Sequence, residues 1–149
     1  MIDIRMVKNK IGAIQRDLNE LKAFERYSFD QVAKDYRTHK IVERIIEVVV
    51  NEAIDINQHI IVKNGKGELP FDFKESFILL TKIDVYPLEF AQTIAKSVGL
   101  RNILVHQYSK LDEQLFYASI KDCLAQYTRY CAYIIRYLEG LTTITRIAS

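Results

Sequence analysis

The segment Arg-Asn-Ile-Leu-Val-His-Gln-Tyr, residues 101–108, combines three side chains that can do chemistry. A guanidinium such as that of Arg101 is a permanently charged, fork-shaped donor that suits phosphate oxygens. An imidazole such as that of His106 takes up and releases protons near neutral pH. Together they meet the minimum for cleaving RNA without a metal. The imidazole removes the proton of a ribose 2′-OH, which attacks the adjacent phosphorus, while the guanidinium stabilises the charge that builds on the phosphoryl oxygens.

A helical wheel separates this segment into two arcs. At about 100° per residue, one arc presents polar side chains and the other is apolar. The polar arc holds Arg101, Asn102, His106 and Tyr108 with Val105 among them, and the apolar arc holds Leu100, Ile103 and Leu104.

The spread of the polar arc predicts how it would be used. Arg101 and His106 lie more than about 100° apart around the helix axis, so one flat surface would not contact both side chains. A cleft between two copies of the helix would engage both residues. A two-fold dimer would also supply a second histidine as general acid. The alternative is a solvated helix face with incidental hydrogen bonds.

A second polar stripe lies on an earlier predicted helix, where Asn51, Asp55 and His59 follow at four-residue steps. These side chains could line the same cleft, and the Asp55 carboxylate could support Arg101. They could equally form an exposed stripe or hydrogen bonds between helices. His39 lies in a polar helical turn, so we expect it to be solvated.

The remaining candidate sites are weaker. The three histidines show no four-residue ligand spacing, so we expect no metal site. Two cysteines eight residues apart, Cys123 and Cys131, match no zinc spacing and are typical of buried thiols in a reducing compartment. Tyr130, Tyr133 and Tyr137 form an aromatic stripe that could stack on bases. A core or dimer-interface stripe is the favoured interpretation.

Composition is typical of a single soluble domain. The chain has 149 residues, 21 basic and 19 acidic, so it lacks a highly basic surface but could still hold a basic cleft. Its first ten residues contain charges throughout, which argues against a signal peptide. The apolar runs are too short to cross a bilayer. We therefore predict one cytoplasmic domain over residues 1–149, without a membrane partner.

The elements that must position these residues are all predicted to be helices. Two prolines and five glycines are too few for an all-β domain. Apolar residues recur at three- and four-residue steps over residues 7–24. Residues 27–63 are predicted to form one long helix despite a β-branched run, and residues 64–72 a loop. Further helices are predicted over 73–85, 86–108 and 111–140, the last ending at Gly140. The fold class is therefore an all-α, up-and-down bundle of four or five helices.

The segment 101–108 also resembles a known family. Its Arg-x4-His-x-Tyr pattern is similar to the signature of HEPN-domain toxins of the HepT group, and Asn102 is the usual polar residue after the arginine. The surrounding order is similar too, with Gly-Leu-Arg-Asn leading the motif and Phe-Lys-Glu-Ser-Phe-Ile-Leu-Leu before it. The resemblance covers roughly residues 5–140.

That resemblance implies a fold, an activity and a partner. HepT-like proteins are all-α homodimers with a composite cleft where the motif arginines and histidines of both subunits meet. Arg101 and His106 would be catalytic in a metal-independent ribonuclease, with Asn102 and Asp55 supporting them. The partner would be an MNT-type nucleotidyltransferase antitoxin that transfers AMP from ATP to Tyr108. This would block the cleft and repel RNA. ATP and magnesium would then belong to the antitoxin, and this chain would need no cofactor.

Two other functions fit the same residues. One is a non-catalytic HEPN module that binds RNA or nucleotides and is regulated by a nucleotidyltransferase. The other is a structural helical bundle whose polar arc is a dimer seam.

Overall fold

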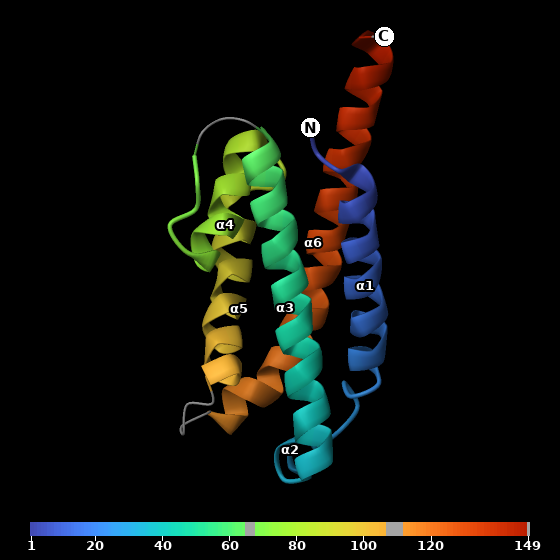
Figure 1. The fold of residues 1–149 in the computed structure, drawn as a ribbon. Coiled ribbons are helices and arrows are strands. Elements are labelled where there is room, and N and C mark those ends of the chain that lie inside the picture. The colour runs from blue at the N-terminus through green and yellow to red at the C-terminus, as the bar shows by residue number, and fades with distance from the viewer. Residues whose placement is uncertain (65–67, 107–111, 149) are drawn as a thin grey trace.

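Helices dominate the computed structural model, which describes residues 1–64, 68–106 and 112–148. In chain order they are α1 (Ile4–Lys22), α2 (Phe29–Ala33), α3 (Tyr36–Asn64), α4 (Phe73–Leu79), the 3₁₀ helix η1 (Leu80–Ile83), α5 (Leu88–His106) and α6 (Glu113–Ala148). Figure 1 shows that α1 and α5 run in one direction while α3 and α6 run in the other. The predicted all-α, up-and-down bundle is confirmed, and its described residues form four long α-helices and two short ones, α2 and α4.

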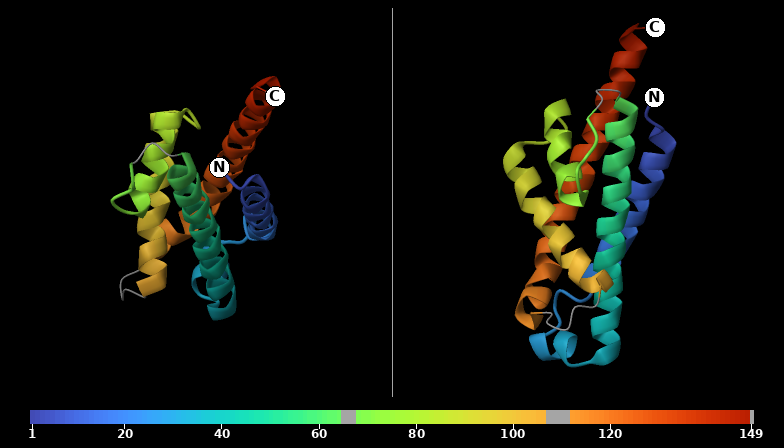
Figure 2. Two further views of the ribbon diagram at one scale, coloured as in Figure 1. Left: turned by 45° about the horizontal axis from the view of Figure 1, so that its top comes forward. Right: turned by 60° about the vertical axis from the view of Figure 1, so that its left-hand side comes forward.

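Helix α3 lies at the centre of the bundle. Helix α1 packs against α3 and α6, whereas α4 and α5 pack against each other and against α3. The carboxyl-terminal turns of α6 extend beyond the other helices (Figure 2). Helix α3 therefore contacts α1 on one side of the bundle and α4 and α5 on the other.

The first helix follows its sequence pattern closely. The carboxylate of Asp3 accepts a hydrogen bond from the backbone N–H of Met6 at 3.0 Å and caps the helix. The residues that repeat at three- and four-residue steps are all buried: Val7, Ile11, Ile14, Leu18 and Leu21. Local amphipathicity therefore predicted the buried face of α1 correctly.

The central helix is helical through its β-branched run, as predicted. Val49, Val50 and Ile56 have no exposed surface, because neighbouring helices cover α3 on several sides. The prediction of one helix over residues 27–63 is wrong at its start, since α2 ends at Ala33 and α3 begins at Tyr36. Asp35 accepts hydrogen bonds from the Arg37 backbone and the Thr38 hydroxyl in a local cap that starts a new helix.

The prediction that the last helix ends at Gly140 is wrong, because α6 runs on to Ala148. Leu138 is buried and Leu141 packs against the core on either side of the glycine, so packing continues past it. A glycine within a helix costs only about 1 kcal/mol relative to alanine.

Two features of α6 match their predictions. Tyr127 and Tyr130 have no exposed surface, which confirms the core interpretation for Tyr130. Cys123 and Cys131 are buried free thiols. Burial raises the pKa of each thiol to about 12, so both stay protonated and unreactive near neutral pH.

A membrane span is not found within residues 1–64, 68–106 and 112–148, where every helix is too short or too polar to cross a bilayer.

Candidate functional site

The polar arc lies on the last turns of α5. Leu104 is buried, Arg101 and Asn102 are half-buried, and Val105 and His106 are exposed. The buried Leu104 and the exposed His106 agree with the wheel, whereas Leu100 and Ile103 of the apolar arc are half-buried like Arg101 and Asn102. Tyr108, the remaining member of the polar arc, lies outside the described residues.

The guanidinium of Arg101 is held at several points. Its Nε donates to the side-chain oxygen of Asn51 at 2.7 Å, and its Nη1 donates to the side-chain oxygen of Asn102 at 3.1 Å. Its Cζ lies over the ring of Phe73, 5.2 Å from the ring centroid. These neighbours come from α3, α4 and α5, so the tertiary fold determines where the positive charge lies.

None of these contacts neutralises the charge of Arg101. Both hydrogen-bond acceptors are uncharged amides, and no carboxylate of the described residues lies within 4.0 Å of the guanidinium. Only two of the five N–H bonds of the group are used by these amides. An ordered cation whose other N–H donors meet no acceptor among the described residues can bind a phosphate oxygen.

The exposed imidazole of His106 lies on the last residue of α5. Five residues along an ideal helix separate it from Arg101 by about 7.5 Å of rise and about 140° of rotation. The two groups share the polar arc of one helix but point in different directions. This separation agrees with the predicted need for a concave or shared site.

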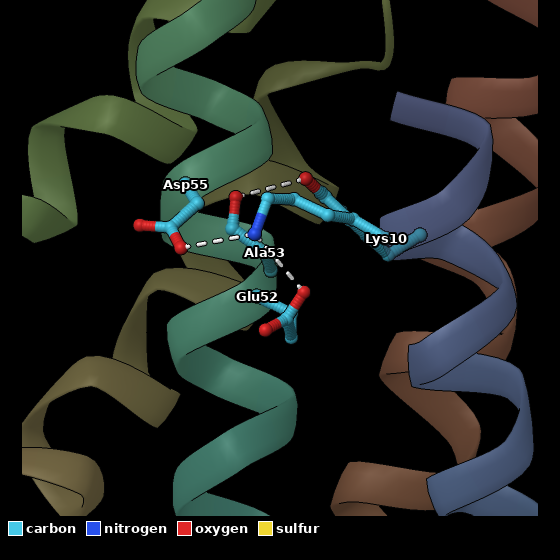
Figure 3. Close-up of polar contacts among 5 residues, drawn as sticks. Lys10, Glu52, Ala53 and Asp55 are labelled. Atoms are coloured by element: carbon cyan, nitrogen blue, oxygen red, sulfur yellow. Dashed lines mark hydrogen bonds and ion pairs between the residues drawn. The ribbon is translucent and has the colours of Figure 1, made fainter. Parts of the chain in front are cut away.

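The polar residues of the stripe on α3 contact two different neighbouring helices. Asn51 reaches Arg101, whereas the carboxylate of Asp55 pairs with Lys10 of α1 at 3.3 Å, as Figure 3 shows. Glu52 also lies 3.3 Å from Lys10. Support for Arg101 thus comes from an amide, and the expectation that Asp55 provides it is not met. Each four-residue step on a helix rotates a side chain by about 40°, enough to move the stripe from α5 towards α1.

Opposite charges meet where α1 contacts α3. Burial opposes the positive charge of Lys10, but the Glu52 and Asp55 carboxylates outweigh it and raise the pKa of the lysine. The next stripe residue, His59, accepts a hydrogen bond from the backbone N–H of Asp3 at 2.9 Å. Burial and the nearby Lys63 lower the pKa of His59. For Asp55 and His59, the interhelix interpretation is therefore confirmed.

His39 differs from its prediction, because it is largely covered rather than solvated. Its ring centroid lies 4.5 Å from that of Phe116, and its Nδ1 lies 3.0 Å from a Glu43 carboxylate oxygen. The contact with α6 is one that a local sequence pattern does not reveal.

A cavity of about 600 Å³ lies on the opposite side of α5 from the polar arc. Its apolar wall comes from α3, α5 and α6 and includes Ile46, Val50, Leu100, Ile103, Leu115 and Cys123. Since Leu100 and Ile103 belong to the apolar arc, the cavity is separate from the Arg101 contacts.

Sequence reasoning missed one residue of the site and the role of another. Phe73 gave no signal, because nothing in an aromatic residue 28 positions earlier indicates contact with Arg101. Asn51 was recognised only as part of a stripe. In the part of the chain that the structure describes, no group of three or more His, Cys, Asp or Glu side chains could hold a metal ion.

Comparison with known proteins supports one family. The family model described as Ribonuclease HepT-like matches residues 14–134. A tRNA nuclease HepT from Aphanizomenon flos-aquae is 37% identical over 136 residues, covering 91% of this chain and 92% of the relative. An mRNA nuclease HepT from Shewanella oneidensis is 28% identical over 107 residues, covering 72% of this chain and 79% of that protein.

Solved structures agree with the sequence matches. A tri-AMPylated HEPN toxin from Shewanella oneidensis, in complex with MNT antitoxin, superimposes with a TM-score of 0.80 at 25% identity. The match covers 91% of this chain and 99% of that one. A toxin–antitoxin structure with AMP-PNP has the same TM-score at 23% identity and shares the fold.

Proposed function

Because the chain belongs to the HepT-like ribonuclease family, we propose that it is the toxin of a HEPN/MNT toxin–antitoxin pair and cleaves RNA. The observation that carries the proposal is the Arg101 guanidinium, which is ordered by two amides and an aromatic ring and lacks a carboxylate partner among the described residues. It lies on the same polar arc of α5 as His106. The nuclease names of the relatives support RNA as the substrate class.

The proposed reaction is a transesterification. The imidazole of His106 removes the proton of a ribose 2′-OH, and the 2′-oxygen forms a bond to the adjacent phosphorus. The bond from phosphorus to the 5′-oxygen breaks, and a second histidine protonates that leaving oxygen. Arg101 stabilises the negative charge on the non-bridging oxygens. The products carry a 2′,3′-cyclic phosphate and a 5′-hydroxyl.

A homodimer would complete this site. The rotation between Arg101 and His106 makes it difficult for one helix to engage a single phosphate with both groups. A two-fold axis beside α5 would bring the arginine of each protomer towards the histidine of the other and would supply the general acid. Asn102, which accepts a hydrogen bond from Arg101, would support the cation within each protomer.

Regulation is proposed to act through Tyr108. The related Shewanella toxin is tri-AMPylated in complex with an MNT antitoxin, which supports a nucleotidyltransferase partner for this chain. AMP groups on Tyr108 would add bulk and negative charge close to Arg101 and His106 in sequence, and would repel RNA. ATP and magnesium would serve the antitoxin, so the toxin itself is proposed to need no cofactor.

Metal removal tests the reaction class. We expect the purified toxin to cleave RNA at the same rate in excess EDTA as in magnesium, because His106 and Arg101 supply the proton transfer and the charge. The measurement is gel analysis of a labelled RNA, with mass spectrometry of the product ends. Products ending in 2′,3′-cyclic phosphate are expected. Activity that disappears in EDTA would contradict the mechanism, and RNA binding without cleavage would indicate a non-catalytic HEPN module.

Co-expression with the antitoxin tests the regulation. We expect intact mass spectrometry to show one or more added AMP units on the wild-type chain and none on a Tyr108→Phe variant. Tyr36→Phe is the matched control, because Tyr36 is 74% exposed and lies far from the motif in sequence. A neutralised complex with unmodified Tyr108 would mean that the antitoxin acts by covering the site.

A further inference from the structure

The Phe73 ring lies at the edge of the proposed site and contacts its cation. Phe73 is the first residue of α4 and is 38% exposed, and the Cζ of Arg101 lies 5.2 Å from its centroid. Asn51 restrains the guanidinium at Nε, while the ring restrains it at Cζ. A long, flexible arginine side chain is thereby held at two points contributed by two different helices.

A buried chain of hydrogen bonds leads to the backbone of Phe73. The hydroxyl of Tyr130 donates to the side-chain oxygen of Asn57 at 2.6 Å. The Asn57 amide nitrogen donates to the hydroxyl oxygen of Ser76 at 3.2 Å, and that hydroxyl donates to the Phe73 carbonyl at 2.6 Å. Asn57, Ser76 and Tyr130 have no exposed surface.

This series of hydrogen bonds holds the short helix α4 against the core. A helix of seven residues is unstable by itself, so tertiary contacts must fix its position. Each side chain in the series donates to the next acceptor, and loss of one partner would leave a buried polar group unpaired. The series of hydrogen bonds therefore favours one position of the first turn of α4, where Phe73 lies.

We infer that Phe73 is a positioning residue for the Arg101 guanidinium, and that the hydrogen-bond chain from Tyr130 fixes its place. The inference rests on the proposed ribonuclease function, since it gives Phe73 a task only if Arg101 binds the reacting phosphate. Phe73 keeps the guanidinium in the orientation that meets the transition state.

The first test compares Phe73, the first residue of α4, with Phe71, which precedes the helix. Phe73→Leu removes the aromatic face and is expected to lower kcat by about tenfold with KM unchanged. Phe73→Tyr keeps the face and should retain near wild-type kcat. Phe71→Leu is the matched control, because Phe71 is two residues away and 92% exposed, and it should leave kcat unchanged.

The second test compares two buried serines. Ser76→Ala interrupts the chain and is expected to lower kcat about threefold, again without a change in KM. Ser119→Ala is the control, because Ser119 is also buried and also donates to the carbonyl three residues earlier, but in α6. Thermal unfolding of both variants separates lost stability from lost positioning.

A direct readout of Arg101 distinguishes this inference from the proposed function. In NMR spectra of the wild-type chain, the Nε–H of Arg101 should exchange slowly with water, and Phe73→Leu should speed that exchange while Phe71→Leu does not. Equal exchange and equal kcat in the two leucine variants would overturn the inference alone. Wild-type cleavage by Arg101→Ala would instead overturn the catalytic role of Arg101, and the inference with it.

Discussion

Replacing His106 by alanine is expected to lower the rate of RNA cleavage by about 10²- to 10⁴-fold, the usual contribution of a positioned general acid–base group. In a two-fold dimer the substitution removes both the base and the proposed acid, so the loss should lie towards the upper end. His106 is exposed on the last residue of α5, so its truncation should leave the fold intact. Single-turnover cleavage of a labelled RNA measures the effect.

The control for this substitution is His59→Ala. His59 lies on α3 and accepts a hydrogen bond from the Asp3 backbone, away from the polar arc. Its replacement should preserve the cleavage rate, although it removes the acceptor of an exposed hydrogen bond. Equal rates for wild type and His106→Ala would remove this histidine from the mechanism. Circular dichroism of both variants verifies that each remains folded.

Truncation of Arg101 is the second large effect that we expect. Arg101→Ala should lower kcat by about 10²- to 10³-fold, the typical cost of removing a group that stabilises transition-state charge. Arg101→Lys should rescue only part of this loss, because a lysine cannot reproduce the planar fork that reaches Asn51 and a phosphate together. Steady-state kinetics of the three proteins give the comparison.

Arg129→Ala is a close control for that experiment. The guanidinium of Arg129 also lies over an aromatic ring, 5.0 Å from the centroid of Phe90, but it belongs to α6. Losing a stacked arginine there should leave kcat unchanged. A similar fall in both variants would indicate a general loss of positive charge or of stability rather than a specific role for Arg101.

The elements of the fold followed mainly from short-range sequence patterns. The spacing of Val7, Ile11 and Ile14 predicted the buried face of α1, because a helix repeats its faces every three to four residues. The helical state of α3 was also predicted through its β-branched run. The break before Tyr36 and the continuation past Gly140 were missed, because capping and packing contacts decide where a helix ends.

For the candidate site, too, some features follow from the sequence and others only from the tertiary structure. The sequence by itself determined that Arg101, Asn102 and His106 share one polar arc, because residue order and helical rotation place them there. Only the tertiary structure decided what surrounds the cation. Asn51 lies 50 positions away in sequence, and Asn57 lies 73 positions from Tyr130. Such pairs depend on how whole helices pack, and a rotation of about 40° per four residues separates Asn51, which meets Arg101, from Asp55, which meets α1.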